Sequence, residues 1–215
     1  MEDIQYSKES VIIGAGGLGR ELLSFINHSR KFNGNVPNIV GFVDDNQTAL
    51  DKFNLDLQVI DSLSNNDLNK YESILLAINS SDLKRNIFSN TDNSKIHGFV
   101  HHTCIIGDRT KVDQSVVLFS NVLISCDAEV SKGVFINCGT QIGHDVFIDE
   151  FTNIMANVDL GGHCKIGKNV LIGTGSTIYP GVKIADNTII GAGSVVFRNI
   201  KEAGTYVGNP AKKIF

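Results

Sequence analysis

Tryptophan is absent from the 215-residue sequence, and proline, methionine and cysteine are scarce, with three, two and four residues. The closest two cysteines are twelve residues apart, so the sequence contains no CxxC pair. It therefore offers neither a zinc knuckle nor a disulfide framework. We expect all four cysteines to be reduced thiols: Cys104, Cys126, Cys138 and Cys164.

The sequence also lacks a basic excess and a long apolar run. It has 19 Lys and Arg against 23 Asp and Glu, a net charge of −4. Nucleic acid is therefore not an expected partner, because binding to a phosphate backbone needs positive charge. No apolar segment approaches the roughly 18 residues of a membrane span, and the polar, acidic residues 1–10 do not resemble a signal peptide. These absences predict a cytoplasmic protein without membrane insertion.

Before about residue 96, short apolar runs alternate with amphipathic segments. Four aliphatic runs predict buried strands, and two segments with apolar residues at helical spacing predict helices. The alternation indicates a small Rossmann-like α/β domain with a mostly parallel sheet over residues 1–96. The predicted strands are residues 10–14, 38–43, 57–60 and 73–78, and the predicted helices are residues 19–29 and 81–88.

A strict period of six residues begins at Val100 and continues to Val196. Seventeen consecutive positions in this register are Val, Ile or Leu. If such residues make up about 30% of a sequence, chance gives this run on the order of once in 10⁹. From Cys104 onward, the residue two positions before each aliphatic residue is small or β-branched. Alternation by two is strand geometry, so both registers are expected to face one interior.

Short strands without hairpin signals predict a solenoid with three hexads in each turn. Each face would stack on the preceding coil at about 4.8 Å. Glycine often follows the large aliphatic residue, as at Gly107, Gly143 and Gly161, which is expected where a corner needs a positive φ or a close backbone approach. The period leaves open the handedness of the coil and whether the solenoid is catalytic or a scaffold.

One titratable pair, His144 and Asp145, stands out from the repeat. Residues eighteen apart stack on successive coils, so His144 should lie between Cys126 and Gly162, outside both interior registers. An imidazole over a glycine amide offers a base for a nucleophile and a donor for an oxyanion, which acyl transfer requires. By itself the pair is also typical of a solvated surface histidine. Four other histidines are expected to be exposed: His28, His97, His101 and His102.

The segment GAGGLG, residues 14–19, fits GxGxxG between a predicted strand and a predicted helix. Such glycines let backbone amides approach a diphosphate at a helix N-terminus. An NAD-dependent dehydrogenase is therefore an alternative for this half, although four strands are fewer than the six of a full dinucleotide fold. The candidate diphosphate-binding residues are Gly14, Gly16, Gly17 and Gly19.

Polar residues follow two other predicted strands. Asp44 and Asp45 come after the second strand, where a dinucleotide-binding protein holds a ribose. Asn79 and Arg85 come after the fourth strand, at the carboxyl edge of the sheet where ligands of such folds bind. All four are candidate substrate-binding residues.

The hexads and the C-terminal YVGNPAKKIF, residues 206–215, resemble the left-handed β-helix acyltransferases. VIIGAGGLGRE (11–21), VGFVDDN (40–46) and LLAIN (75–79) are similar to one branch, the sugar acetyltransferases of bacillosamine, perosamine and sialic acid metabolism. The resemblance covers residues 10–215. It implies a left-handed parallel β-helix over residues 97–215, acetyl-CoA as co-substrate without a metal, and a homotrimer with active sites between subunits.

The resemblance also implies roles at the active site. His144 matches the catalytic base, and Asp145 matches the acidic residue that supports it. Gly162 matches the glycine whose amide meets the thioester carbonyl. Asn153 departs from the pattern, because several members have a histidine there that contacts the cofactor. The implied cofactor-binding residues are Asn137, Asn153, Gly162, Pro210 and Lys212.

On the substrate side, the resemblance implies that the glycine loop holds the diphosphate of a nucleotide sugar. Asp44 and Asp45 would lie near its base and ribose. Leu18 departs from a histidine that is common in this loop. His163, beside Gly162, is a further candidate for substrate contact.

The predicted function is transfer of acetyl from acetyl-CoA to the amino group of a nucleotide-linked amino-deoxy sugar, in the synthesis of surface glycans. O-acetylation of sialic or a related nonulosonic acid is the alternative within the class. A zinc enzyme like the β-helix carbonic anhydrases is disfavoured, because His144 and His163 are the only histidines beyond the first coil. A noncatalytic β-helix scaffold is the alternative from another class.

Overall fold

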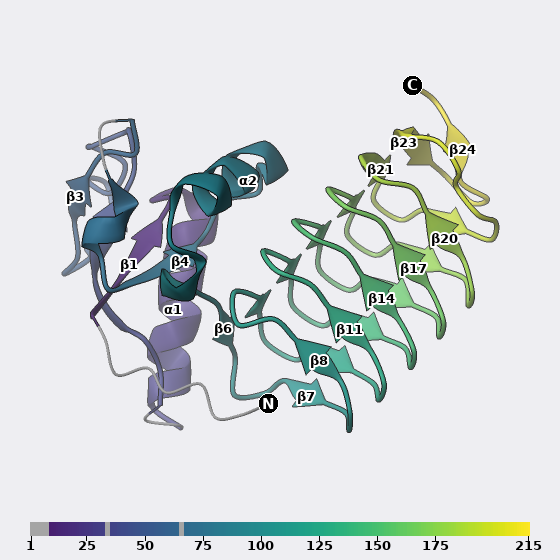
Figure 1. The fold of residues 1–215 in the computed structure, drawn as a ribbon, viewed down its shortest axis with the longest axis horizontal. Helices are drawn as coiled ribbons and strands as arrows, with labels where there is room; N and C mark the ends of the chain where they lie inside the picture. Colours follow the sequence, from purple (N-terminus) through teal and green to yellow (C-terminus); the bar gives the residue numbers. More distant parts are fainter. Residues whose placement is uncertain (1–8, 33–34, 65–66) are drawn as a thin grey trace. The chain divides into compact units, whose positions relative to one another are not determined.

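The computed structural model describes residues 9–32, 35–64 and 67–215, so the N-terminal stretch 1–8 lies outside the described residues. The chain divides into two units, which we call the α/β unit, ending at His102, and the β-helix, Thr103–Phe215. The division comes six residues after the boundary expected at residue 96. Figure 1 shows both units, each of which is described by itself.

The α/β unit contains a parallel sheet in the order β3-β2-β1-β4-β5. The four predicted strands and two predicted helices are present, whereas β5 was not predicted. Its strands are β1 (Glu9–Ile13), β2 (Asn38–Val43), β3 (Val59–Asp61), β4 (Ser73–Leu76) and β5 (Ile96–His97), and β6 (Phe99–Val100) follows. Its helices are α1 (Gly17–Arg30) and α2 (Ser81–Asn90), with short 3₁₀ turns η1 (Leu68–Lys70) and η2 (Asn93–Lys95).

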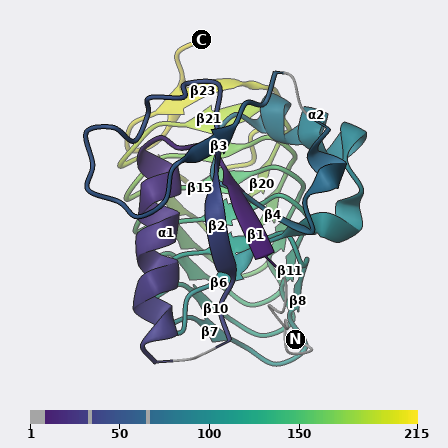
Figure 2. The same ribbon diagram turned by 90° about the vertical axis from the view of Figure 1, so that its left-hand side faces the viewer.

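The strand order reverses between β1 and β4. Right-handed crossovers in opposite directions place the helices on opposite faces, and Figure 2 shows α1 and α2 on either side of the strands. Because both faces are covered, Ile12 and Ile13 of β1 and Ile74 and Leu75 of β4 are completely buried. The carboxyl ends of β1 and β4 form the edge where ligands bind in open α/β sheets.

Two titratable side chains of this unit are buried against expectation. Lys84 on α2 is 2% exposed, and burial lowers the pKa of its amine to about 7. His101 is also 2% exposed, so the prediction that it lies on the surface was wrong. The reason is aromatic packing, since the rings of Phe25 and Phe99 meet its imidazole edge to face.

The β-helix has three faces, each made of very short strands that pair in parallel from coil to coil (Figure 1). The first face contains β7 (Ile105–Ile106), β10 (Leu123–Ile124), β13 (Gln141–Ile142), β16 (Asp159–Leu160), β19 (Thr177–Ile178) and β22 (Val195–Val196). The second contains β8 (Lys111–Val112), β11 (Glu129–Val130), β14 (Phe147–Ile148), β17 (Lys165–Ile166) and β20 (Lys183–Ile184). The third contains β9 (Val117–Leu118), β12 (Phe135–Ile136), β15 (Asn153–Ile154), β18 (Leu171–Ile172), β21 (Thr188–Ile190), β23 (Gly204–Val207) and the antiparallel β24 (Lys212–Lys213).

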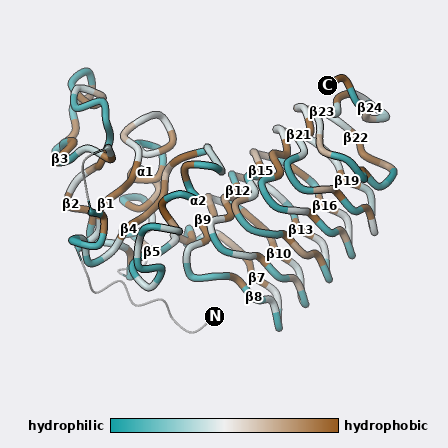
Figure 3. The backbone as a smooth tube through the Cα atoms, turned by 45° about the horizontal axis from the view of Figure 1, so that its top comes forward, coloured by the Kyte–Doolittle hydropathy of each residue, from teal (hydrophilic) through white to brown (hydrophobic). Residues whose placement is uncertain are grey.

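Both predicted interior registers are confirmed from Val116 onward, whereas the first register residues, Val100, Ile106 and Val112, are only half-buried. Every large aliphatic residue of the period from Leu118 to Val196 is at most 3% exposed, and the small partners Thr140, Thr152 and Ser176 are completely buried. Figure 3 shows hydrophobic and hydrophilic segments alternating along each coil of the β-helix. The glycines that follow the aliphatic residues let the backbone of the next coil approach closely, and none of them has a positive φ. At Gly143, for example, a Cβ would lie 2.6 Å from the amide nitrogen of Gly162 on the next coil.

No helix among residues 9–32, 35–64 and 67–215 has both the length and the apolar character needed to cross a membrane.

Candidate active site

His144 lies at a corner of the β-helix, between β13 and β14. The next residue, Asp145, has a φ of 59°, in the left-handed region. In an extended segment the two side chains would point to opposite faces, but this corner turns them together. His144 Nδ1 lies 2.7 Å from Asp145 Oδ2, and the two side chains are 53% and 48% exposed. The pair is therefore hydrogen-bonded and open to solvent.

This hydrogen bond determines which ring nitrogen of His144 is available. An ionised carboxylate only accepts hydrogen bonds, so Nδ1 carries the hydrogen that is donated to Asp145. In the neutral ring, Nε2 is then the unprotonated nitrogen. Nε2 lies over Gly162, where a Cβ would be only 2.7 Å away from it. The basic nitrogen therefore faces the backbone of the next coil.

Gly162 occupies the same corner as His144, one coil further along. Its carbonyl accepts a hydrogen bond from the Gly181 amide at 2.8 Å, but its own amide has no hydrogen-bond partner within the described residues. Because Gly162 has no side chain, the His144 imidazole lies directly over its backbone. A proton acceptor and a backbone donor beside each other can serve an attacking nucleophile and a developing oxyanion.

Other charged and titratable side chains line the same corner. His163 Nδ1 is 3.7 Å from Asp145 Oδ2, and its ring meets that of His144 edge to face, with centroids 4.8 Å apart. One coil before Asp145 lies Asp127, whose two carboxylate oxygens accept hydrogen bonds at 2.6 and 2.7 Å from Arg109, one coil earlier still. The Arg109 guanidinium is the main cause that lowers the pKa of Asp127. The eighteen-residue period predicts this column, but Arg109 and Asp127 were not among the predicted site residues.

Two predicted cofactor-binding residues lie at other places on the β-helix. Asn137 is at the corner between β12 and β13, and its side-chain oxygen accepts a hydrogen bond from the Cys138 amide at 2.7 Å. Asn153 in β15 is 2% exposed and donates to the Phe151 carbonyl at 3.5 Å. Neither residue joins the His144 corner within one chain, and their contact with a cofactor stays a prediction.

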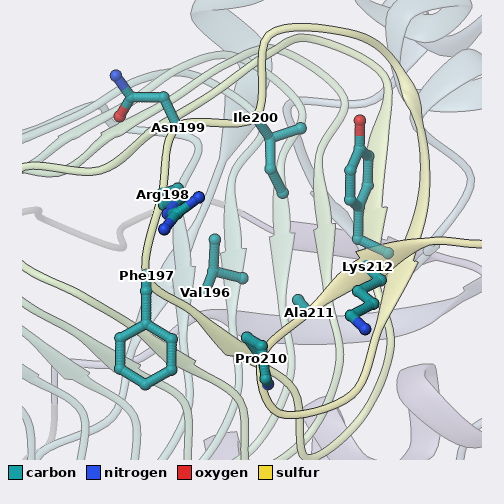
Figure 4. Close-up of a pocket in the computed structure, with 9 residues that line it drawn as sticks. Val196, Phe197, Arg198, Asn199, Ile200, Pro210, Ala211 and Lys212 are labelled. Atoms are coloured by element: carbon teal, nitrogen blue, oxygen red, sulfur yellow. The ribbon is translucent and has the colours of Figure 1, made fainter.

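Pro210 and Lys212 line a cavity of about 550 Å³ at the C-terminal end of the β-helix. Figure 4 shows Ala211 next to Pro210 and Lys212, and Arg198 and Tyr206 also line the cavity. The volume is within the range of pockets for small ligands, about 300–1,000 Å³. None of the residues that line the cavity belongs to the His144 corner.

In the α/β unit, the glycine loop follows β1 and leads into α1. Gly14 has a φ of 100°, and a Cβ on Gly19 would lie 1.9 Å from the Gly14 carbonyl oxygen, so the loop packs against the start of the helix. A Cβ at Gly16 would meet nothing within 4 Å. Helix α1 begins at Gly17 without a side-chain cap. The first-turn amides thus remain available to an anion, as the glycine pattern predicts.

The two predicted aspartates have separate partners. Asp44 accepts hydrogen bonds from the Ala15 amide at 2.7 Å and from the Asn46 amide at 2.8 Å, so it lies against the glycine loop. Asp45 is exposed and turns to Ser62 Oγ at 2.5 Å and the Ser64 amide at 2.9 Å. The hydrogen bond from Ser62 is the main cause that lowers the pKa of Asp45.

Asn79 and Arg85 are exposed and flank the start of α2. Arg85 forms an ion pair with Asp82 at 3.3 Å, one helical turn earlier. Ser80 caps this helix by accepting a hydrogen bond from the Leu83 amide at 3.2 Å. The structure thus puts both residues beyond β4, the place predicted for them, and their contact with a substrate stays a prediction.

Comparison with known proteins supports this architecture. The PglD N-terminal domain matches residues 10–91, and the bacterial transferase hexapeptide family matches residues 163–198. The acetyltransferase domain of PglB from Neisseria gonorrhoeae FA1090 is 24% identical with a TM-score of 0.83, over 97% of this chain and 100% of that chain.

Two further solved structures share the fold over nearly the whole chain. PerB from Caulobacter crescentus is 21% identical with a TM-score of 0.82, over 97% of this chain and 98% of that one. WeeI from Acinetobacter baumannii AYE is 18% identical with a TM-score of 0.64, over 95% and 99%. The predicted resemblance is confirmed: residues 10–91 match the PglD N-terminal domain, residues 163–198 match the hexapeptide repeats of bacterial transferases, and the chain has the fold of the PglB acetyltransferase domain and of PerB.

Proposed function

We propose that this protein transfers the acetyl group of acetyl-CoA to the amino group of a nucleotide-linked amino-deoxy sugar. The observation that carries the proposal is the His144 corner. Nδ1 of His144 is held by Asp145, and Nε2 lies over Gly162, whose amide is unpaired within the described residues. These are the two groups that acyl transfer from a thioester requires.

In the proposed reaction the sugar amine attacks the thioester carbonyl carbon, and His144 Nε2 accepts a proton from the amine. The carbonyl oxygen becomes an oxyanion that accepts a hydrogen bond from the Gly162 amide. When the tetrahedral intermediate collapses, the C–S bond breaks and CoA leaves as a thiolate, which takes the proton from the imidazolium. The products are the acetamido sugar and CoA, and His144 returns to its neutral form. Asp145 stabilises the imidazolium while it exists.

The neighbours of this chain support the substrate class. The PglB acetyltransferase domain has been solved with acetyl coenzyme A, and PerB with CoA and GDP-perosamine. A nucleotide sugar carries the diphosphate for which the uncapped start of α1 is suited, and perosamine is an amino sugar. We therefore assign Gly14, Gly16, Gly17 and Gly19 to the diphosphate of the nucleotide-linked acceptor sugar, with Asp44, Asp45, Asn79 and Arg85 around it.

We also propose that the active enzyme is a cytoplasmic homotrimer with sites between subunits. Asn137 and His144 lie at different corners of one β-helix, and the cavity with Pro210 and Lys212 does not include His144. A neighbouring copy would bring such separated residues to one cofactor. Exposed apolar residues on the face of β7 and β10 support contact between copies, since Ile105 is 63% and Leu123 38% exposed.

The test measures CoA release from acetyl-CoA with a panel of acceptors. We expect turnover with nucleotide-linked amino-deoxy sugars and none with sialic acid or with sugars that carry only hydroxyl groups. His144→Ala should reduce kcat about 10²–10⁴-fold, the contribution of a positioned general base. Asp108→Ala is the matched control, because Asp108 is an exposed residue two coils earlier at the same corner.

Native mass spectrometry and circular dichroism establish that each variant is folded and assembled as the wild type is. Wild-type turnover by folded His144→Ala would refute the assignment of His144 as the base. If the protein acetylates hydroxyl-only acceptors and no amino sugars, it is an O-acetyltransferase and the proposal of N-acetylation is wrong.

A further inference from the structure

Three histidines of the α/β unit gather at one place. His28 is in the last turn of α1, and His101 and His102 follow β6. Each offers one ring nitrogen, and the three atoms lie within 4.8 Å of one another. Some point is therefore within about 2.8 Å of all three. Side-chain shifts of less than about 1 Å would bring each nitrogen to the zinc–imidazole distance of 2.0–2.1 Å.

The pair of His28 and His101 already has a suitable spacing. His28 Nδ1 lies 3.2 Å from His101 Nε2, and the two ring planes differ by 4°. Two nitrogens bound to one tetrahedral zinc ion are about 3.4 Å apart, given the usual bond length. In the absence of an ion, one hydrogen bond joins these nitrogens. An ion would replace that single proton and draw in the third ring.

The surroundings of the cluster are those of a built site. Ser29, which is 1% exposed, places Oγ 3.0 Å from His102 Nδ1 and accepts the His102 amide at 3.3 Å. Histidine ligands commonly bond through the other ring nitrogen in this way, which fixes the ring and leaves Nε2 for the ion. Phe32 stacks on His102 with centroids 4.6 Å apart, so one side of the cluster is apolar.

The exposure of the cluster also suits a metal. His28 is exposed, which leaves an open side for entry of the ion and for a water as fourth ligand.

We propose that His28, His101 and His102 bind a zinc ion that fastens the end of α1 to the segment after β6. An all-imidazole set favours zinc over magnesium or calcium, which take oxygen ligands. The ligands on the two segments are 73 residues apart, so the ion would act as a cross-link within the α/β unit. The site is structural and takes no part in the proposed acetyl transfer.

The experiment uses the full chain after removal of metals with a chelator. We expect calorimetric titration with Zn²⁺ to show one tight site per chain, and Co²⁺ to give the visible absorption of a tetrahedral nitrogen site. We also expect Zn²⁺ to raise the melting temperature. His28→Gln should weaken the tight site by more than about tenfold, as loss of even a supporting residue does. Because His28 is exposed, this variant should fold, and His102→Gln is the second variant.

A matched control is needed because His144, Asp145 and His163 also place ligand atoms within 4.8 Å of one another. The double variant His144→Gln with His163→Gln should keep the tight site. No Zn²⁺ binding by the wild type, or loss of the tight site only in this double variant, would overturn the proposal. Acetyl transfer is measured separately, with the expectation that His28→Gln retains it, so failure of the zinc site and failure of the proposed enzyme activity are distinguishable.

Discussion

The β-helix and the α/β unit both bury rows of aliphatic residues, but they differ in where each residue finds its neighbours. Ile154 in the β-helix stacks between Ile136 and Ile172, eighteen residues away on either side. Ile12 in the α/β unit pairs with Phe42 and Leu75, 30 and 63 residues further along. Neighbours at one fixed separation make every coil a copy of the last, whereas neighbours at unequal separations give each position its own surroundings.

The strongest test of this difference is a cavity in the middle of the β-helix. Ile154 is completely buried between two coils, so Ile154→Ala should lower the free energy of unfolding by about 2–5 kcal/mol. An outward residue, Ile189 in β21, is 43% exposed and should lose less than about 0.5 kcal/mol on the same change.

The measurement is denaturant unfolding followed by circular dichroism, because the chain has no tryptophan to report by fluorescence. Both variants are compared at one protein concentration, since assembly would otherwise contribute to stability. Equal losses for Ile154→Ala and Ile189→Ala would show that stacking between coils does not carry the stability of the β-helix.

A second test uses Lys84, a buried lysine of the α/β unit. Its folded pKa of about 7 lies below the unfolded value of 10.5. Between these pH values the unfolded chain holds the proton more firmly, so wild-type stability rises with pH across this window. Lys84→Met removes that dependence and should raise the free energy of unfolding at pH 7 on the order of 2 kcal/mol, with the gain shrinking toward pH 10.5.

Unfolding curves at pH 7 and pH 9.5 for both proteins check this expectation. Lys52→Met is the control: Lys52 is exposed, and because this variant keeps Lys84, its stability should rise with pH as that of the wild type does. A Lys84→Met variant that is less stable than the wild type at both pH values would show that the buried amine is needed where it lies.

The same difference explains what the sequence could predict. Ile136, Ile154 and Ile172 appear in one period, so the faces and interior of the β-helix were predictable residue by residue. Strand β5, Ile96–His97, has only two residues and no period, and its pairing with β4 depends on the folded sheet. The burial of His101 and Lys84 depends on residues far along the chain, which the local pattern does not contain.

At the candidate active site, the eighteen-residue period correctly predicts that His144 lies over Gly162. It did not predict how the hydrogen bond with Asp145 forms, because two adjacent side chains in a strand diverge. That bond depends on the φ of 59° at Asp145, a corner conformation that a side-chain pattern does not encode. The column that leads from Asp145 to His163 was within reach of the same eighteen-residue count.

The smallest effect is expected from one methyl group added at Gly162, one coil after His144. A Cβ at Gly162 would lie 2.7 Å from His144 Nε2, so Gly162→Ala forces the imidazole to move by several tenths of an ångström. The fold should be unchanged, because Gly162 does not have a positive φ and the added methyl group would face the exposed His144 ring. We expect kcat to fall about tenfold, or about 1.4 kcal/mol, since the base and the amide no longer share one reacting position.

Asp108→Ala serves again as the control, because it removes a side chain at the same corner but two coils away from His144. Turnover of the same amino sugar is compared for both variants, and the NMR signals of the His144 ring report its displacement. A displaced ring with unchanged kcat would mean that Nε2 does not act from the place where it lies over Gly162. An undisplaced ring with a tenfold loss would instead locate the effect at the Gly162 amide, because the methyl group would then obstruct the oxyanion and not the base.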